Sequence, residues 1–167
     1  MIKLEKFEKA DYAQLISWIK DEEALMQFGG PNFSFPLTAE QLDKSQEDKQ
    51  RHSFKVVDME TSRTIGHCEV YLLEDTAKLA RIIIGDETQR GKGIGKEIVK
   101  TLIEFAVNVL QKKKIELNVF DWNVGAIKCY ESVGFKINPN KNLERKVNGK
   151  TWIAVNMVLQ TELTVDG

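Results

Sequence analysis

Cysteine is scarce in this chain, which has two cysteines among 167 residues. Cys68 and Cys129 each lie in a periodic apolar segment, and neither belongs to a Cys-x-x-Cys pair or to a Cys/His cluster with metal-ligand spacing. This distribution argues against a disulfide framework and against a cysteine-based metal site. We therefore expect a functional site that holds no metal.

The chain also lacks an excess of charge of either sign. Its 24 basic and 25 acidic side chains give a formal net charge of -1 and are scattered along the sequence. The one dense basic run, at 112–114, lies between two apolar segments and is typical of an exposed turn. Surfaces that bind nucleic acid are strongly basic, so we expect no nucleic-acid partner.

Long hydrophobic runs, repeats and low-complexity tracts are missing as well. No apolar stretch approaches the roughly 20 residues that cross a bilayer, and no basic segment followed by an apolar run opens the chain. We expect a cytoplasmic protein without a membrane partner. The 42% hydrophobic and 29% charged residues are ordinary for one globular domain. We place that domain at 1–160 and a flexible tail at 161–167.

The hydrophobic pattern changes its period several times along the chain. It predicts a strand at 2–7, helices at 12–19, 21–28 and 39–50, strands at 53–59, 64–74 and 78–85, a helix from 93 to the triple lysine, a strand at 115–119, a helix at 124–132, and strands from 135 and from 152. The strands at 53–85 are separated by short turn-prone stretches, which favours an antiparallel meander. Asn148-Gly149 is a typical hairpin turn.

A glycine-rich segment opens the most strongly periodic helix of the chain. We call residues 89–96 the phosphate loop; they are Gln89, Arg90, Gly91, Lys92, Gly93, Ile94, Gly95 and Lys96. A helix N-terminus offers free N–H groups and the positive end of the helix dipole. The glycines let the backbone approach a pyrophosphate, and the basic side chains add positive charge. The pattern indicates an anion site, with a plain tight turn as the alternative.

Two other phosphate motifs do not fit this segment. It lacks the Gly-Lys-Ser/Thr ending of a nucleotide triphosphate loop, and the strands before it are hairpin-connected rather than parallel.

Two features in a fixed order instead carry a family resemblance. Arg90, Gly93 and Gly95 match an Arg/Gln-x-x-Gly-x-Gly/Ala pattern, and Asn123, Ala126 and Tyr130 follow at helical spacing before Gly134-Phe135. The sequence thereby resembles the GNAT acetyltransferase superfamily.

The resemblance covers most of the chain, and its N-terminal part looks most like the ribosomal-protein N-terminal acetyltransferase branch. It implies an α+β fold with a mixed, mostly antiparallel central sheet flanked by helices. It also implies acetyl-CoA as cosubstrate and direct acetyl transfer to a primary amine in a ternary complex. An acyl-enzyme on Cys129 is not expected.

The same resemblance implies roles for individual residues. Tyr130 matches the family's general acid, which protonates the leaving thiolate; a core tyrosine is the alternative. Asn123, with Ala126 on the same face, is expected to hold the cofactor's pantetheine arm or to orient the helix. Backbone N–H groups at 81–85 are expected to bind the carbonyl oxygen, with Ile82 and Ile84 facing the cofactor.

The general base is the least defined role. Glu69 shares one strand face with His67 and Tyr71, and apolar neighbours are expected to raise its pKa into a useful range. A structural glutamate is the alternative reading. His67 is a second candidate base, and a water ordered by Asn118 is a third.

The acceptor amine is not identified by any residue. A small molecule such as a polyamine, amino sugar or amino acid is one class, and a protein N-terminus or lysine is another. A non-catalytic acyl-CoA-binding sensor or scaffold is a third possibility. We expect specificity to depend on the loop at 27–37, the helix after Thr38 and the hairpin around Asn148. The long C-terminal strands are compatible with a homodimer.

Overall fold

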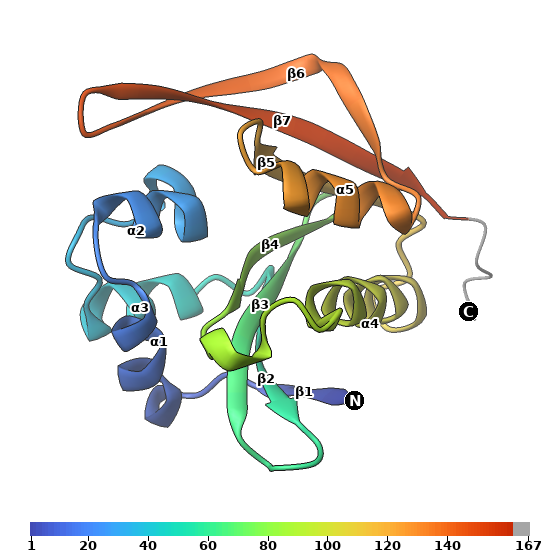
Figure 1. The fold of residues 1–167 in the computed structure, drawn as a ribbon. Coiled ribbons are helices and arrows are strands. Elements are labelled where there is room, and N and C mark those ends of the chain that lie inside the picture. The colour runs from blue at the N-terminus through green and yellow to red at the C-terminus, as the bar shows by residue number, and fades with distance from the viewer. Residues whose placement is uncertain (162–167) are drawn as a thin grey trace.

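The computed structural model describes residues 1–161, and within them the chain forms one mixed α/β unit (Figure 1). The strands are β1 (Ile2–Lys6), β2 (Arg51–Asp58), β3 (Thr64–Leu72), β4 (Thr76–Ile84), β5 (Lys114–Phe120), β6 (Lys136–Val147) and β7 (Lys150–Gln160). The α-helices are α1 (Tyr12–Trp18), α2 (Glu22–Gly29), α3 (Ala39–Gln46), α4 (Ile94–Asn108) and α5 (Val124–Ser132). Short 3-10 turns are η1 (Lys9–Asp11), η2 (Gly30–Asn32) and η3 (Glu87–Gln89).

All seven described strands belong to one sheet in the order β1-β2-β3-β4-β5-β7-β6. Every neighbouring pair is antiparallel except β4 and β5, which run parallel. The parallel pair joins the meander β1–β4 to the C-terminal strands, and α4 makes the crossover between its two members. The predicted α+β fold and the antiparallel meander are confirmed.

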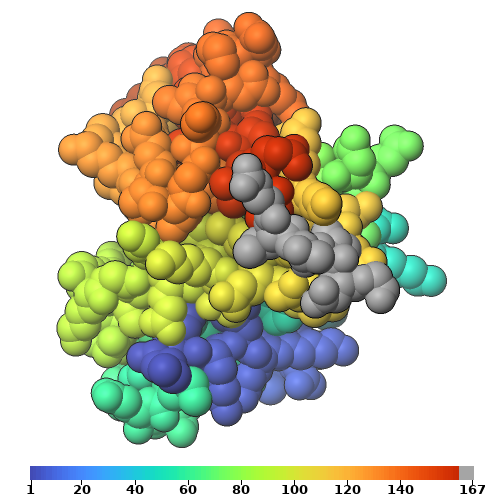
Figure 2. Space-filling model, turned by 90° about the vertical axis from the view of Figure 1, so that its right-hand side faces the viewer, coloured from blue at the N-terminus to red at the C-terminus, as the bar shows by residue number. Residues whose placement is uncertain are grey.

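Helices cover the sheet on both faces, and each face has its own apolar core (Figure 1). On one face, α4 buries Ile98, Leu102 and Ala106 completely against the strands. On the other, α1, α2 and α3 enclose a smaller cluster around Leu15, which is 1% exposed. Figure 2 views the first face, with α4 and the loop before it in yellow-green below α5 and β6 in orange.

The boundaries of the elements differ from the sequence prediction mainly at α3. This helix ends at Gln46 instead of Gln50, because a turn with backbone bonds from Asp48 to Ser45 and from Arg51 to Asp48 leads into β2. Thr38 Oγ1 accepts the N–H of Gln41 as expected of a cap. The Gln41 side chain bonds Ser34 and the carbonyl oxygen of Pro36 in the preceding loop, and its amide also donates to Thr38 Oγ1. The tail predicted after Thr161 lies outside the described residues.

The β6–β7 hairpin extends past the sheet toward α2 (Figure 1). Asn148 and Gly149 both have positive φ, 49° and 74°, which is the conformation that a two-residue hairpin turn requires. Near the tip, Asn148 Nδ2 and Lys150 Nζ lie 3.4 and 3.3 Å from the Glu23 carboxylate of α2. The hairpin therefore closes over the space beside α2.

Candidate active site

Strands β4 and β5 separate halfway along their length. Their pairing covers only Thr76–Leu79 and Lys114–Leu117, and beyond these ranges the strands have no register partners in each other. A bulge interrupts the pairing of β3 with β4 at the same level, and Arg81 there has a φ of 51°. The edge of β4 at 80–84 thus faces an opening, where its backbone groups have no strand beside them.

The phosphate loop lies where β4 leads into α4. Gly93 is the N-cap of α4 with a φ of 79°, and Gly91 has a φ of 78°. The first helical bond runs from Glu97 N to Gly93 O, so the N–H groups of the three residues between them have no partner within the helix. A Cβ on Gly91 or Gly93 would meet nothing within 4 Å. The loop presents free donors to open space, as an anion site requires.

The loop is also tied to the end of β4. Arg90 Nε donates to the carbonyl oxygen of Ile84 at 3.0 Å. The Ile84 side chain comes within 3.9 Å of the Cβ position of Gly95, and it packs against the main core. The expected cofactor residues Ile84 and 89–96 are therefore neighbours, although they do not line the cavity described below.

Helix α5 carries Tyr130 to the other side of the opening. Asn123 caps this helix, since its Oδ1 accepts the N–H of Ala126 at 3.3 Å. The Tyr130 ring packs edge-on against Phe135, and burial raises the pKa of the phenol to about 12, with Cys129 adding to the shift. No described residue forms a hydrogen bond with the Tyr130 hydroxyl. The phenol is thus protonated and free to donate.

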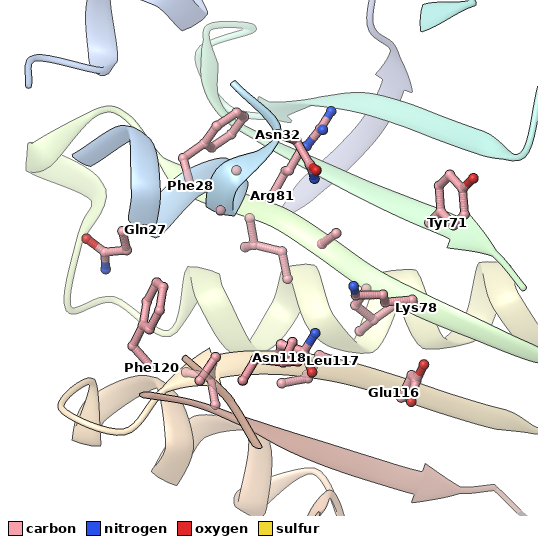
Figure 3. Close-up of a pocket in the computed structure, with 18 of the residues that line it drawn as sticks. Gln27, Phe28, Asn32, Tyr71, Lys78, Arg81, Glu116, Leu117, Asn118 and Phe120 are labelled. Carbon is pink, nitrogen blue, oxygen red and sulfur yellow. The ribbon is translucent and has the colours of Figure 1, made fainter. Parts of the chain in front are cut away.

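A cavity of about 650 Å³ passes through the opening to the face that carries α2 (Figure 3). Ile82, Asn123 and Tyr130, which are among the predicted site residues, line it. Residues 26–32 of α2 and η2 line its other side, and they overlap the first part of the loop at 27–37 from which we expect specificity. The hairpin contributes through β6 and through Ala154 of β7 rather than through its tip, and α3 does not line the cavity.

Glu69 lies behind this cavity in a closed ionic network. Its Oε1 is 2.8 Å from Arg51 Nη1 and 3.3 Å from Arg81 Nη1, and its Oε2 is 2.7 Å from His67 Nε2. The carboxylate is 3% exposed and does not line the cavity. The shared strand face of His67, Glu69 and Tyr71 is as predicted from alternation. Both carboxylate oxygens of Glu69 are thus engaged, Oε1 by the two arginines and Oε2 by His67.

The raised pKa expected for Glu69 is wrong. Burial by itself acts to raise the pKa of this carboxyl, but the hydrogen bond and attraction from His67 and the charges of Arg81 and Arg51 outweigh it. The pKa falls to about 2. The expectation failed because it counted only the apolar neighbours along the strand, whereas the two arginines come from β2 and β4.

The cations around the cavity were not predicted from the sequence. Those that line it are Arg51, Lys78, Arg81, Lys141 and Arg145. Lys78 was detectable, because it interrupts the buried run of Ala77 and Leu79 on β4. The others come from strands far apart in the chain, so no local pattern connects them. Glu116 is the single carboxylate among the lining residues.

Asn118, expected to order a water, lines the cavity beside this carboxylate. The buried Asn156 of β7 donates to Asn118 Oδ1 at 3.0 Å and lies 3.3 Å from Glu116 Oε2.

Within residues 1–161 the structure shows no cluster of three or more His, Cys, Asp or Glu suited to a metal ion. In the same range no helix is long and apolar enough to cross a membrane.

Comparison with known proteins agrees with this architecture. Spermidine N-acetyltransferase of Vibrio cholerae, solved with CoA and spermine, superposes with a TM-score of 0.78 at 21% identity, covering 95% of this chain and 94% of that one. A putative phosphinothricin N-acetyltransferase superposes with a TM-score of 0.77 at 18% identity, covering 98% of this chain and 100% of that one. At these identities the likeness shows the fold.

Curated relatives match shorter parts of the chain. Spermine/spermidine N(1)-acetyltransferase of Bacillus subtilis is 40% identical over 53 residues, which is 32% of this chain and 35% of that protein. N-acetyltransferase 9-like protein of Caenorhabditis briggsae is 26% identical over 131 residues, 71% of this chain and 66% of that protein. The matched segment thus spans about a third of the Bacillus relative. The model of the acetyltransferase (GNAT) domain matches residues 2–136, and the chain therefore belongs to the GNAT acetyltransferase family.

Proposed function

We propose that this protein transfers an acetyl group from acetyl-CoA to a primary amine by direct attack in a ternary complex. The observation that carries the proposal is the opening between β4 and β5, with the phosphate loop at one side and Tyr130 at the other. Acetyl-CoA would supply the thioester whose C–S bond breaks as the amine nitrogen bonds to the carbonyl carbon. This arrangement favours transfer over a sensor or scaffold role, which needs no proton donor at the opening.

The phosphate loop and the β4 edge hold the cosubstrate in this proposal. Free N–H groups at the start of α4, with Lys92 and Lys96, bind the pyrophosphate. The edge of β4 pairs with the pantetheine arm as a missing strand would, beside Ile82 and Asn123. Unpaired N–H groups of this edge then stabilise the charge that develops on the carbonyl oxygen.

Tyr130 serves as the general acid for the leaving thiolate. Its pKa of about 12 keeps the phenol protonated throughout the physiological range, so the donor is always present. An amine with a pKa near 10.4 is mostly protonated at pH 7 and must lose a proton before it attacks. The low pKa and the enclosure of Glu69 make it a poor base. We assign that proton to a water beside Asn118 and give Glu69 the task of positioning Arg51 and Arg81.

The acceptor enters from the α2 face, where the cavity is open to a molecule of ordinary substrate size. Two of the relatives named above are spermidine or spermine acetyltransferases, and we include both acceptor classes, a small amine and a protein N-terminus. A homodimer and the branch within the family stay predictions.

Calorimetric titration with acetyl-CoA tests the proposal. We expect the wild type to bind at micromolar concentration and to release CoA thiol when an amine pool is added. Gly93→Glu should abolish binding, because its carboxylate extends into the open space in front of the free N–H groups. Gly93→Ala is the matched control, because it places a side chain at the same positive φ without the charge or bulk of Glu. It should weaken binding far less. A folded wild type that does not bind acetyl-CoA overturns the proposal.

A further inference from the structure

The part of the cavity on the α2 face carries an excess of positive charge. Five cationic side chains line the cavity, against the single carboxylate of Glu116. That carboxylate is already engaged, since Lys141 Nζ and Asn156 Nδ2 each lie 3.3 Å from its Oε2. The buried Glu69 offsets part of the charge of Arg51 and Arg81 from behind. A cationic ligand therefore finds no free acid here among the described residues.

Several cations of this group have donors to spare. No carboxylate of residues 1–161 lies within ion-pair distance of Lys78 or Arg145, and Arg145 Nη1 donates only to the carbonyl oxygen of Glu144. The Nε of Arg51 also has no partner in the same range, but it is buried, so Arg51 contributes its charge to the cavity rather than this donor. Burial lowers the pKa of the Lys78 ammonium, Glu116 opposes this, and Lys141, Arg145 and Arg51 lower it further. The positive charge around Lys78 is thus only partly offset by Glu116 and Glu69.

These donors lie on the acceptor side of the sheet. Ala77 and Leu79 point into the core beneath α4, so Lys78 between them points to the opposite face. Figure 3 shows Lys78 and Arg81 on β4 and Tyr71 on β3 around the cavity, with Gln27 and Phe28 of α2 across it. The phosphate loop, which would hold the cosubstrate's own phosphates, is not part of this lining.

We propose that the acceptor is a small amine that also carries a carboxylate or phosphate group, with Lys78, Arg145 and Arg51 binding that anion while the amine reaches the opening between β4 and β5. This inference rests on the proposed acetyl transfer and narrows its substrate class. A polyamine would place a second ammonium among cations that are only partly offset, whereas an anion would gain charge-assisted hydrogen bonds.

Binding of acetylated products tests this preference without requiring turnover. The full-length protein, with and without CoA, is titrated with the N-acetyl derivatives of δ-aminovalerate, pentylamine and cadaverine, which have similar chain lengths and an anionic, a neutral and a cationic end. We expect the anionic product to bind about tenfold or more tightly than the cationic one, and salt to reduce the difference. Acetyl-transfer rates with the three parent amines should follow the same order.

Charge-removing variants then locate the preference. Lys78→Met and Arg145→Gln should each lower affinity for the anionic product and leave acetyl-CoA binding intact, while Lys113→Met, an exposed lysine away from the cavity, should change neither. Equal or tighter binding of the cationic product by the wild type overturns the inference, as does a preference that survives in the double variant. A protein that binds the anionic product but not acetyl-CoA would instead overturn the proposed acetyl transfer.

Discussion

At the scale of single residues, Tyr130 has the most clearly defined chemistry. Replacing it with Phe removes the proton donor and keeps the ring that packs on Phe135. We expect kcat to fall about 100-fold or more, because a positioned acid contributes about that factor, while the Kd for acetyl-CoA stays essentially unchanged. Rapid-quench or thiol-release kinetics together with calorimetry measure both quantities. Equal turnover by the variant would remove Tyr130 from the mechanism.

Glu69 makes a second residue-scale prediction, which concerns stability. Replacement by Gln leaves Arg51 and Arg81 without their buried counter-charge, which should cost about 3 kcal/mol of unfolding free energy at pH 7. The carboxyl has a pKa of about 2 in the folded protein, below its ordinary value of 4.5. Its stabilisation is therefore fully present above the ordinary value and is lost as pH falls toward 2.

Urea unfolding of wild type and Glu69→Gln at several pH values checks this sign. The difference between the two proteins should be constant above about pH 5 and shrink below it. A difference that is small at pH 7, or that grows in acid, would show that the ionic network is not what lowers the pKa. The pH profile of kcat/KM in the variant reports separately on its role, since a positioning residue leaves the profile's shape intact.

At the scale of elements, α5 is held more weakly than α4. Its core-facing residues, Tyr130 among them, are only partly buried, whereas α4 buries seven of its fifteen residues. The Asn123 cap is thus a large part of what fixes its N-terminus. Asn123→Ala should cost about 1 kcal/mol and lower kcat through displacement of Tyr130, while Asn123→Ser keeps a capping oxygen and should recover most of the stability. Thermal unfolding and kinetics of both variants measure the effect.

At the scale of the whole molecule, the two apolar clusters share one sheet and should unfold together. Leu15→Ala on the α1 side and Leu102→Ala in α4 each create a cavity in a fully buried position, and each should cost about 2–5 kcal/mol. Val109→Ala, at a 64% exposed position, is a control that should change little. Circular dichroism and tryptophan fluorescence should follow one transition in every variant. Separate transitions would show that the faces are independent units.

Local patterns in the sequence were enough for much of this molecule. The period of apolar residues predicted the meander, α4 and α5, because each pattern depends on neighbours a few residues away. A glycine-rich segment at the start of a strong helix predicted the phosphate loop, and the structure gives Gly91 and Gly93 the positive φ values that such a loop needs. The cofactor and catalytic roles of these residues remain predictions, whereas the fold that presents them is confirmed.

What only the tertiary structure decided is the electrostatics and the shape of the cavity. The charge of Glu69 depends on Arg51 and Arg81, and the charge of the acceptor side depends on side chains from β2, β4 and β6. Strand order and the partial pairing of β4 with β5 bring these residues together. Neither can be predicted from the periodicity of apolar residues. Pair energies between charges depend on distance and burial, and both exist only after the chain has folded.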